Sequence, residues 1–186
     1  ENIGGTHQTM ELILRQLSET DRFELIRFGT YHRTTFKGFA EYSPANFEKG
    51  LRVIRELNSG MGGTEMARPV TDALQMKSDP NRRKVIFLIT DGMISNDETI
   101  YSLWQKYGEN TAIYTFGIGA APAHGILHTL ADESGGAYET VLPDDNMSEI
   151  VLRQLGRVYQ SIVTDLRFDF GNMKVEDMSA PRPICE

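Results

Sequence analysis

Two side chains in this sequence, Thr64 and Asp91, have the types and positions expected of ligands for a small divalent cation. Asp91 comes just after the apolar run Val85–Ile89 and directly before Gly92. Thr64 ends a glycine-rich loop, GMGGT, and its hydroxyl can either cap a helix or bind a cation. Mg²⁺ prefers six oxygen ligands and keeps several waters, so a hydroxyl and a carboxylate suit it. We therefore predict that Thr64 and Asp91 belong to one site.

The apolar run before Asp91 positions this carboxylate. Val85–Ile89 is uninterrupted and rich in β-branched residues, which is typical of a central parallel strand buried on both faces. Open α/β sheets bind their ligands at the carboxyl ends of such strands, where Asp91 would lie. On the other side of the site, Gly62 and Gly63 would let the loop approach a cation closely, and a helix would begin at Thr64 or, if Pro69 marks its first turn, somewhat later.

The rest of the chain alternates between helical and strand patterns, which predicts a parallel sheet covered by helices on both faces. We expect an α/β, Rossmann-like, doubly wound fold whose sheet is mostly parallel, with one antiparallel edge strand over 32–39. The predicted helices cover about 6–17, 43–57, 64–76, 96–107, 122–134 and 144–162, and the other predicted strands cover about 23–28, 84–89, 111–116 and 137–141.

Composition and charge exclude several classes of function. The chain has 186 residues, 40% of them hydrophobic, and a net charge of −7. The acidic balance argues against nucleic acid or an anionic membrane as the main partner. No apolar stretch approaches the roughly 20 residues of a membrane span. The single cysteine, Cys185, excludes an internal disulfide framework and a multi-cysteine zinc site. We predict a domain over 1–164, followed over 165–186 by an exit strand and the start of an adjoining β-rich segment.

Five short motifs occur in an order that resembles the von Willebrand factor type A (VWA) domain. More narrowly, the chain is similar to the branch found in inter-alpha-trypsin inhibitor heavy chains and related VIT-plus-VWA proteins. The resemblance implies a metal-ion-dependent adhesion site (MIDAS) built from three loops, in which Thr64 and Asp91 match the second and third. The motifs are DRFELIRF (21–28), MGGT (61–64), ITDG (89–92), YTFGIG (114–119) and SGGA (134–137).

The first loop of the family's site, an Asp-x-Ser-x-Ser motif at the end of the first strand, does not occur in this sequence. Either a segment just before Glu1 is missing or this member has lost the motif, and we favour the missing segment because the absent strand is the hydrophobic centre of such a sheet. Residues 1–186 should then contain a large apolar gap. With only two ligands, Thr64 and Asp91 would hold Mg²⁺ poorly in this chain.

The resemblance implies a non-catalytic protein-interaction or adhesion module. Its cofactor would be Mg²⁺ (or Mn²⁺ or Ca²⁺) in the intact protein. Its partner would be a protein presenting an Asp or Glu side chain, or a neighbouring domain of the same polypeptide. One alternative is a scaffold that keeps the fold without using the metal. Another is a Rossmann-like enzyme acting at Asp91, although the sequence shows no nucleophile–base pair or complete phosphate loop.

Other residues with chemical potential have simpler structural interpretations. His124 and His128 have an i, i+4 spacing that can suit zinc, but they lack a HExxH glutamate and a third ligand. The acidic residues of 144–149 are expected to bias the start of a helix rather than to bind calcium. The GIG sequence of 117–119 lacks the third glycine of a dinucleotide fingerprint.

Overall fold

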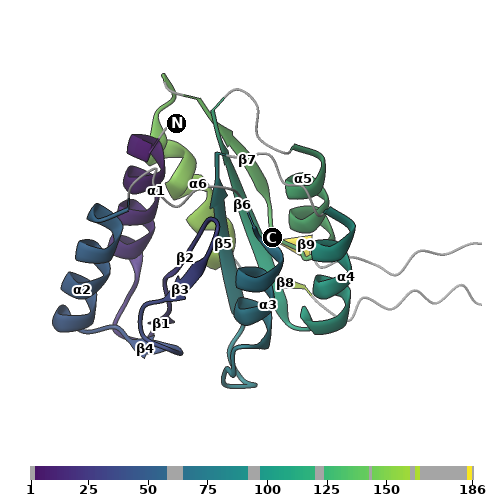
Figure 1. The fold of residues 1–186 in the computed structure, drawn as a ribbon, viewed down its shortest axis with the longest axis horizontal. Coiled ribbons are helices and arrows are strands. Elements are labelled where there is room, and N and C mark those ends of the chain that lie inside the picture. Colours follow the sequence, from purple (N-terminus) through teal and green to yellow (C-terminus); the bar gives the residue numbers. More distant parts are fainter. Residues whose placement is uncertain are drawn as a thin grey trace, which may run out of the picture.

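The computed structural model describes residues 3–57, 65–91, 97–119, 124–142, 144–159, 162–163 and 184–185. The helices are α1 (Ile3–Gln16), α2 (Pro44–Arg55), α3 (Ala67–Gln75), α4 (Asp97–Tyr107), α5 (His124–Glu133) and α6 (Met147–Tyr159). The strands are β1 (Arg22–Phe23), β2 (Ile26–Phe28), β3 (His32–Thr34), β4 (Ala40–Glu41), β5 (Lys84–Thr90), β6 (Thr111–Ile118), β7 (Tyr138–Val141), β8 (Ile162–Val163) and β9 (Ile184–Cys185). Helices and strands alternate from α3 to β8, as the sequence predicts, whereas β1 to β4 are consecutive and are followed by α2 and α3 (Figure 1).

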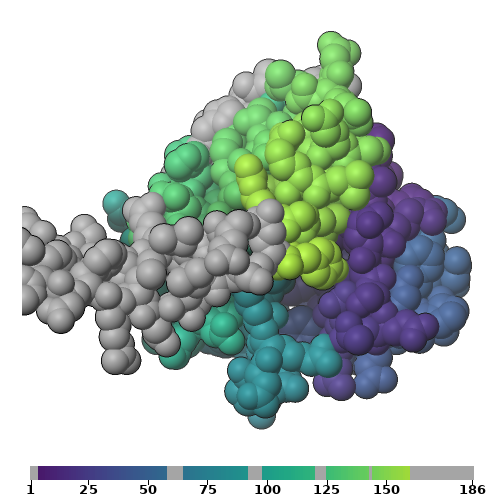
Figure 2. Space-filling view, turned by 180° about the vertical axis from the view of Figure 1, so that it is seen from behind, coloured from purple at the N-terminus to yellow at the C-terminus, as the bar shows by residue number. Residues whose placement is uncertain are grey.

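A parallel sheet of β5, β6 and β7, in that order, confirms the predicted doubly wound architecture. One face of the sheet is covered by α3, α4 and α5. The other face is covered by α1 and α6, which lie side by side as Figure 2 shows. On the first face, Leu88 and Ile113 of the sheet pack against a cluster of Met66, Val70, Leu74, Ile100, Leu127 and Leu130. On the second face, Phe116 and Ile118 pack against Ile13, Ile150, Val151 and Leu155.

The most buried strand is β6, and not the Val85–Ile89 run of β5 for which the sequence predicts burial on both faces. Every residue of β6 is buried, whereas most of β5 is only half-buried. The reason is the pairing: β6 has a strand on each side, but among the described strands β5 pairs only with β6. The prediction of a parallel strand here was correct, and the prediction of full burial was wrong.

The N-terminal strands form antiparallel pairs, β2 with β3 and β1 with β4, which agrees with the predicted antiparallel edge. The sequence predicts continuous strands over 23–28 and 32–39, but both are interrupted. The cause is Glu24, whose carboxylate accepts hydrogen bonds from the backbone N–H groups of Leu25, Thr35, Phe36 and Gly38. The amides of Leu25, Phe36 and Gly38 bond to this side chain instead of a strand partner, and the Thr35 N–H is shared between it and the Leu25 carbonyl.

Two helices begin later than predicted. The first is α3, which begins at Ala67 instead of Thr64, because the Glu65 carboxylate accepts the N–H groups of Ala67 and Arg68. The second is α6, which begins at Met147, after Asn146 rather than Asp144 or Asp145. By contrast, α2 begins where the predicted helix over 43–57 does: the Ser43 hydroxyl accepts the Asn46 N–H at 3.2 Å and so caps the helix.

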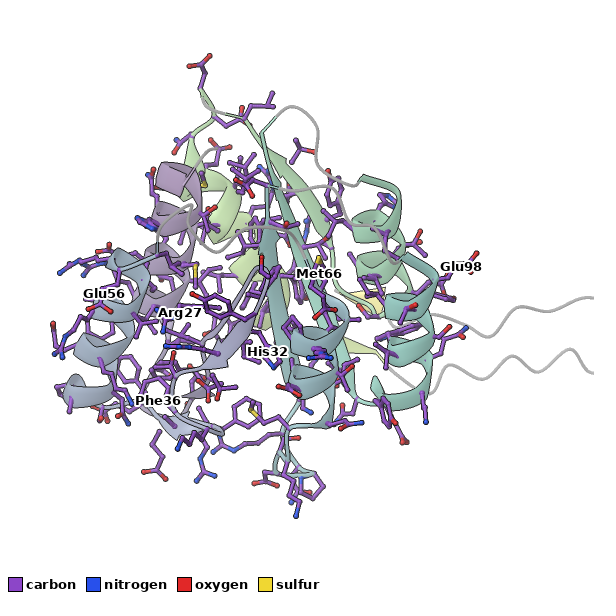
Figure 3. All side chains as sticks on the ribbon, viewed as in Figure 1. Arg27, His32, Phe36, Glu56, Met66 and Glu98 are labelled. Carbon is purple, nitrogen blue, oxygen red and sulfur yellow. The ribbon has the colours of Figure 1, made fainter. Side chains whose placement is uncertain are left out.

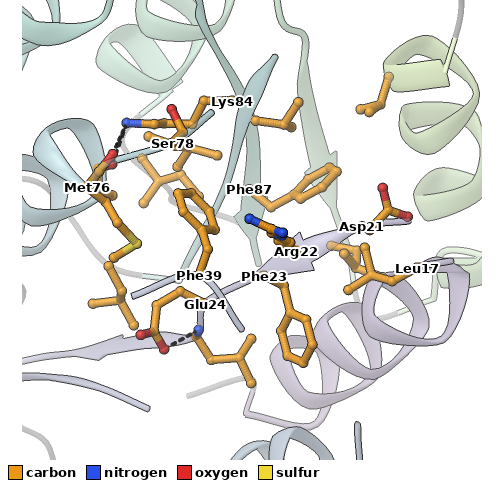
Figure 4. A pocket seen from close by; sticks show the side chains of 18 of the residues that line it. Leu17, Asp21, Arg22, Phe23, Glu24, Phe39, Met76, Ser78, Lys84 and Phe87 are labelled. Atoms are coloured by element: carbon orange, nitrogen blue, oxygen red, sulfur yellow. Dashed lines mark hydrogen bonds between the residues drawn. The ribbon is translucent and has the colours of Figure 1, made fainter. Parts of the chain in front are cut away.

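A cleft of about 640 Å³ separates β2 from β5 (Figure 4). Its walls are the two strands, and helices α1, α3 and α6 contribute side chains to its lining. The lining is mainly apolar and includes Ile13, Leu14, Phe23, Ile26, Phe28, Val70, Ile86, Leu88, Leu155 and Val158. The large apolar gap expected from the sequence is therefore present.

Candidate metal-binding edge of the sheet

The carboxylate of Asp91 lies at the carboxyl end of β5, where the sequence predicts it. Thr90, the last residue of the strand, is buried and pairs in register with Gly117 of β6. The next residue, Asp91, is exposed. Among the described residues, no hydrogen bond or ion pair involves the Asp91 side chain. Its oxygens are therefore available to a cation or a water at this edge.

The predicted site residues Thr64, Gly62, Gly63 and Gly92 lie outside the described residues. What the structure does place is Glu65, the residue after Thr64. The Glu65 N–H donates to the Gly29 carbonyl at 3.2 Å, which fixes this point of the chain at the end of β2. In Figure 1 the tip of the β2–β3 hairpin and the end of β5 point to the same side of the molecule.

Packing below this edge supports the same placement. Met66, which directly follows Glu65, is almost completely buried in the core cluster that contains Leu88. Phe28, the last residue of β2, packs against that cluster as well. The start of α3 is thus anchored beside the final residues of both strands, and Thr64 is two residues from that anchor in the sequence.

The described residues provide only part of a ligand set for a metal ion. No group of three or more His, Cys, Asp or Glu residues within the described part of the chain could hold one. Asp91 offers one carboxylate, and Mg²⁺ seeks six oxygens. A cation at this edge would take its other ligands from water, from residues outside the described ranges, or from a partner. The oxygen chemistry of Asp91 and Thr64 fits such an ion but does not complete its shell.

Glu65 is the residue at this edge that the sequence analysis missed. One oxygen of its carboxylate, Oε1, accepts the Ala67 N–H at 3.0 Å and so caps α3. This oxygen is therefore less available to a cation than Oε2. The signal that could have found it is an acidic residue shortly before Pro69, since acidic caps and early prolines mark helix starts.

Two of the other acidic and histidine candidates have structural roles. His128 packs its ring against Tyr138, with centroids 6.0 Å apart, while the side chain of His124 lies outside the described residues. Asp145 accepts the Leu142 N–H at 2.8 Å and so closes the turn before α6. The contact of His128 matches the packing role expected for it, whereas Asp145 closes the preceding turn and Asn146 accepts the Glu149 N–H at the start of α6.

The two glycines at the end of β6 also have a structural role. Gly117 lies within β6, opposite Thr140 of β7. Gly119 has a φ of 95° and donates its N–H to the Val141 carbonyl at 2.8 Å. A glycine is required there by the left-handed conformation, because other residues adopt it at a cost. The GIG sequence therefore ends the strand.

Comparisons with known proteins agree with this architecture. A family model for the von Willebrand factor type A domain matches residues 5–140. A von Willebrand factor A domain-containing protein of Dictyostelium discoideum is 27% identical over 184 residues, which cover 98% of this chain and 20% of that protein. The chain thus spans about a fifth of the length of this curated relative.

Solved structures share the fold at lower identity. The von Willebrand factor type A protein from Catenulispora acidiphila superposes with a TM-score of 0.74 at 16% identity, covering 83% of this chain and 38% of that one. Proximal thread matrix protein 1 from the mussel byssus, in a form with a zinc-occupied MIDAS motif, gives a TM-score of 0.63 at 23% identity, covering 83% and 40%. The narrower similarity to inter-alpha-trypsin inhibitor heavy chains stays a prediction.

Proposed function

The chain belongs to the von Willebrand factor type A domain family, and on that premise we propose that it is a non-catalytic protein-interaction module with a cation at its binding edge. One observation carries the proposal. The exposed carboxylate of Asp91, which has no partner among the described residues, directly follows β5, and the segment that follows Thr64 is fixed at the end of β2 on the same side. A carboxylate and a hydroxyl from separate loops can then share one cation.

The chemistry of binding follows from the small number of charges at this edge. Mg²⁺ (or Mn²⁺ or Ca²⁺) bound by Asp91 and Thr64 would keep much of its positive charge and several exchangeable waters. A carboxylate of a partner protein, or of a neighbouring domain, can replace one of those waters. Gly62, Gly63 and Gly92 would allow both loops to approach the ion without steric conflict.

A further strand would complete the site. The first strand and Asp-x-Ser-x-Ser loop that the resemblance implies are not among residues 1–186. The cleft between β2 and β5 has two strand edges as walls and helices over it, so an extended apolar segment fits its lining. If that segment ran parallel to β5, it would end beside Asp91 and bring its last residues to the cation.

Whether a cation binds at this edge can be tested with Mn²⁺, whose unpaired electrons broaden nearby NMR signals even when binding is weak. We expect low concentrations of Mn²⁺ to broaden the amide signals of Asp91 and Glu65 well before those of Asp79 and Lys84, at the opposite end of β5. Asp91→Asn should abolish the selective broadening. Asp79→Asn, a matched loss of one exposed carboxylate, should preserve it.

Two results would count against the metal site. One is broadening at Asp91 without broadening at Glu65, which would separate the two loops. The other is selective broadening that survives Asp91→Asn. If Mn²⁺ broadened neither amide selectively, a metal-independent interaction module would be the better description, and the absence of a three-residue ligand group in the described part of the chain is the observation that favours it.

A further inference from the structure

The β2–β3 hairpin places two arginines directly against each other. In the antiparallel register Arg27 pairs with Arg33, so both side chains leave the same face of the hairpin. Like charges at directly opposed positions destabilise a strand pair unless something neutralises them. This arrangement is unusual in a chain whose net charge is −7.

Neither arginine has an acidic partner within the described residues. The ion pairs there involve other arginines or His32, and no carboxylate lies within 4.0 Å of the Arg27 or Arg33 guanidinium. The Arg27 Nε is buried without a hydrogen-bond acceptor. Arg33 is exposed, and its guanidinium lies over the ring of Tyr31 at 5.6 Å from the centroid.

A third cation borders the same hairpin. Lys49 of α2 donates to the Thr35 carbonyl at 3.0 Å and lies over the Phe36 ring at 4.4 Å. Figure 3 places Arg27 between the hairpin and α2. Beyond these side chains, β3 pairs only with β2 among the described strands, so its outer edge offers free backbone groups. Tyr31 beside it is 53% exposed.

We propose that this cationic hairpin surface, formed by Arg27, Tyr31, Arg33 and Lys49, binds an extended acidic segment of a protein partner. The segment would add to the outer edge of β3 as a strand, which is a common mode of peptide recognition. Because side chains alternate along a strand, carboxylates at every second position would all lie on the arginine face. Exposed Tyr31 supplies an apolar contact at the end of the edge.

This surface is independent of the proposed cation. It uses guanidinium and ammonium groups and needs no metal, so its binding should persist in EDTA. Nucleic acid is a poorer candidate than an acidic peptide, since the acidic chain as a whole repels polyanions and this surface has only three cations, two on the hairpin and one on α2. A short strand with a few carboxylates would match the three positive charges of Arg27, Arg33 and Lys49.

The probe is a fluorescein-labelled heptapeptide that alternates Glu and Thr, measured by anisotropy at low ionic strength in EDTA. We expect saturable binding that weakens about three- to tenfold in Arg33→Gln and in Arg27→Gln, as the loss of one surface charge contact implies. Arg55→Gln removes the same charge from an exposed site on α2 that is 3.9 Å from Glu11, and should change the affinity less than twofold. A heptapeptide with Gln in place of Glu should not bind.

Several outcomes would overturn the proposal. Equal affinity in wild type, Arg27→Gln and Arg33→Gln would exclude the hairpin. An equal loss in Arg55→Gln would reduce the effect to overall charge. A peptide of the same composition with its glutamates contiguous should bind more weakly, and equal binding would exclude strand addition. If inorganic phosphate displaced the peptide at the same total concentration of negative charge, the surface would be a simple anion site instead. A thermal melt of each variant shows whether it is folded. Arg33→Lys keeps the charge at this position and should therefore bind more tightly than Arg33→Gln.

Discussion

Replacing Glu24 by glutamine should destabilise the β2–β3 region more than its partial exposure suggests. The carboxylate Oε1 accepts the N–H groups of Leu25 and Thr35 at 2.8 Å and of Phe36 at 2.9 Å. The other oxygen accepts Phe36 at 3.0 Å and Gly38 at 2.9 Å. A carboxylate can satisfy all of these amides because it has no donor of its own.

Glutamine keeps one oxygen but puts an NH₂ group where Oε2 now accepts. The Gly38 N–H would then face another donor, and an unsatisfied amide costs about 1–3 kcal/mol. The remaining bonds would also change from charged to neutral, each losing up to about 1 kcal/mol. We therefore expect Glu24→Gln to lower the free energy of unfolding by about 3 kcal/mol, a large share of the roughly 5–15 kcal/mol typical of a domain.

The assay is urea denaturation followed by far-UV circular dichroism. The matched control is Glu48→Gln, which removes the same charge from an exposed position on α2 and should change the free energy of unfolding by less than about 0.5 kcal/mol. If Glu24→Gln were no more destabilising than Glu48→Gln, the amides would not depend on the carboxylate. The account of why the strands around Glu24 are interrupted would then be wrong.

Three further changes test packing, capping and titration. Gly136→Ala would push a methyl group into the backbone of Ile113, so we expect a loss of more than about 3 kcal/mol in a thermal melt. Lys84→Met should cost about 1–2 kcal/mol in urea, because the Lys84 Nζ donates to the Leu74 and Met76 carbonyls at the end of α3 (2.8 and 2.7 Å). Burial, and then the charge of Asp21, raise the pKa of Tyr159. Its contribution to stability is therefore full below about pH 10 and declines above it, and Tyr159→Phe should reduce that decline in urea midpoints compared at about pH 9 and pH 10.5.

Elements that depend on local patterns could be predicted from the sequence. The Val85–Ile89 run becomes β5, and the hydroxyl of Ser43 caps α2, because apolar periodicity and capping act over a few residues. Gly135 adopts a φ of 70° at the end of α5, as a helix-ending glycine should. Asp91 at the carboxyl end of β5 follows directly from the position of the strand.

Features that depend on long-range contacts could not be predicted. The carboxylate of Glu24 reaches amides more than ten residues away, and nothing in the local pattern marks it. The opposition of Arg27 and Arg33 depends on the register of a hairpin whose turn sequence does not fix it. The partial burial of β5 depends on which strand edges are paired. Each of these requires the three-dimensional arrangement.

The open edge of β5 leads to a last prediction, on hydrogen exchange. Amides of β6 donate to β5, to β7 or, at Ile113, to the Ser134 hydroxyl, so those within the strand should exchange slowly. The amides of β5 that point away from β6 face the cleft, where no described strand receives them. We expect these amides to exchange at least about a hundredfold faster than the amides of Ile113 and Thr115, as measured by NMR.

A longer chain that carries an apolar strand ahead of Ile3 provides the comparison. If that strand enters the cleft, it should accept hydrogen bonds from β5 and slow the exchange of the cleft-facing amides, while β6 changes little. The strand would also bury the apolar lining of the cleft, and each Å² of buried apolar surface stabilises the fold by about 25 cal/mol. The melting temperature should therefore rise as well. Equal protection of β5 and β6 in the present chain would mean that the edge already has a partner. The cleft would then not be the place of a further strand, and the route by which a third loop reaches Asp91 would be lost.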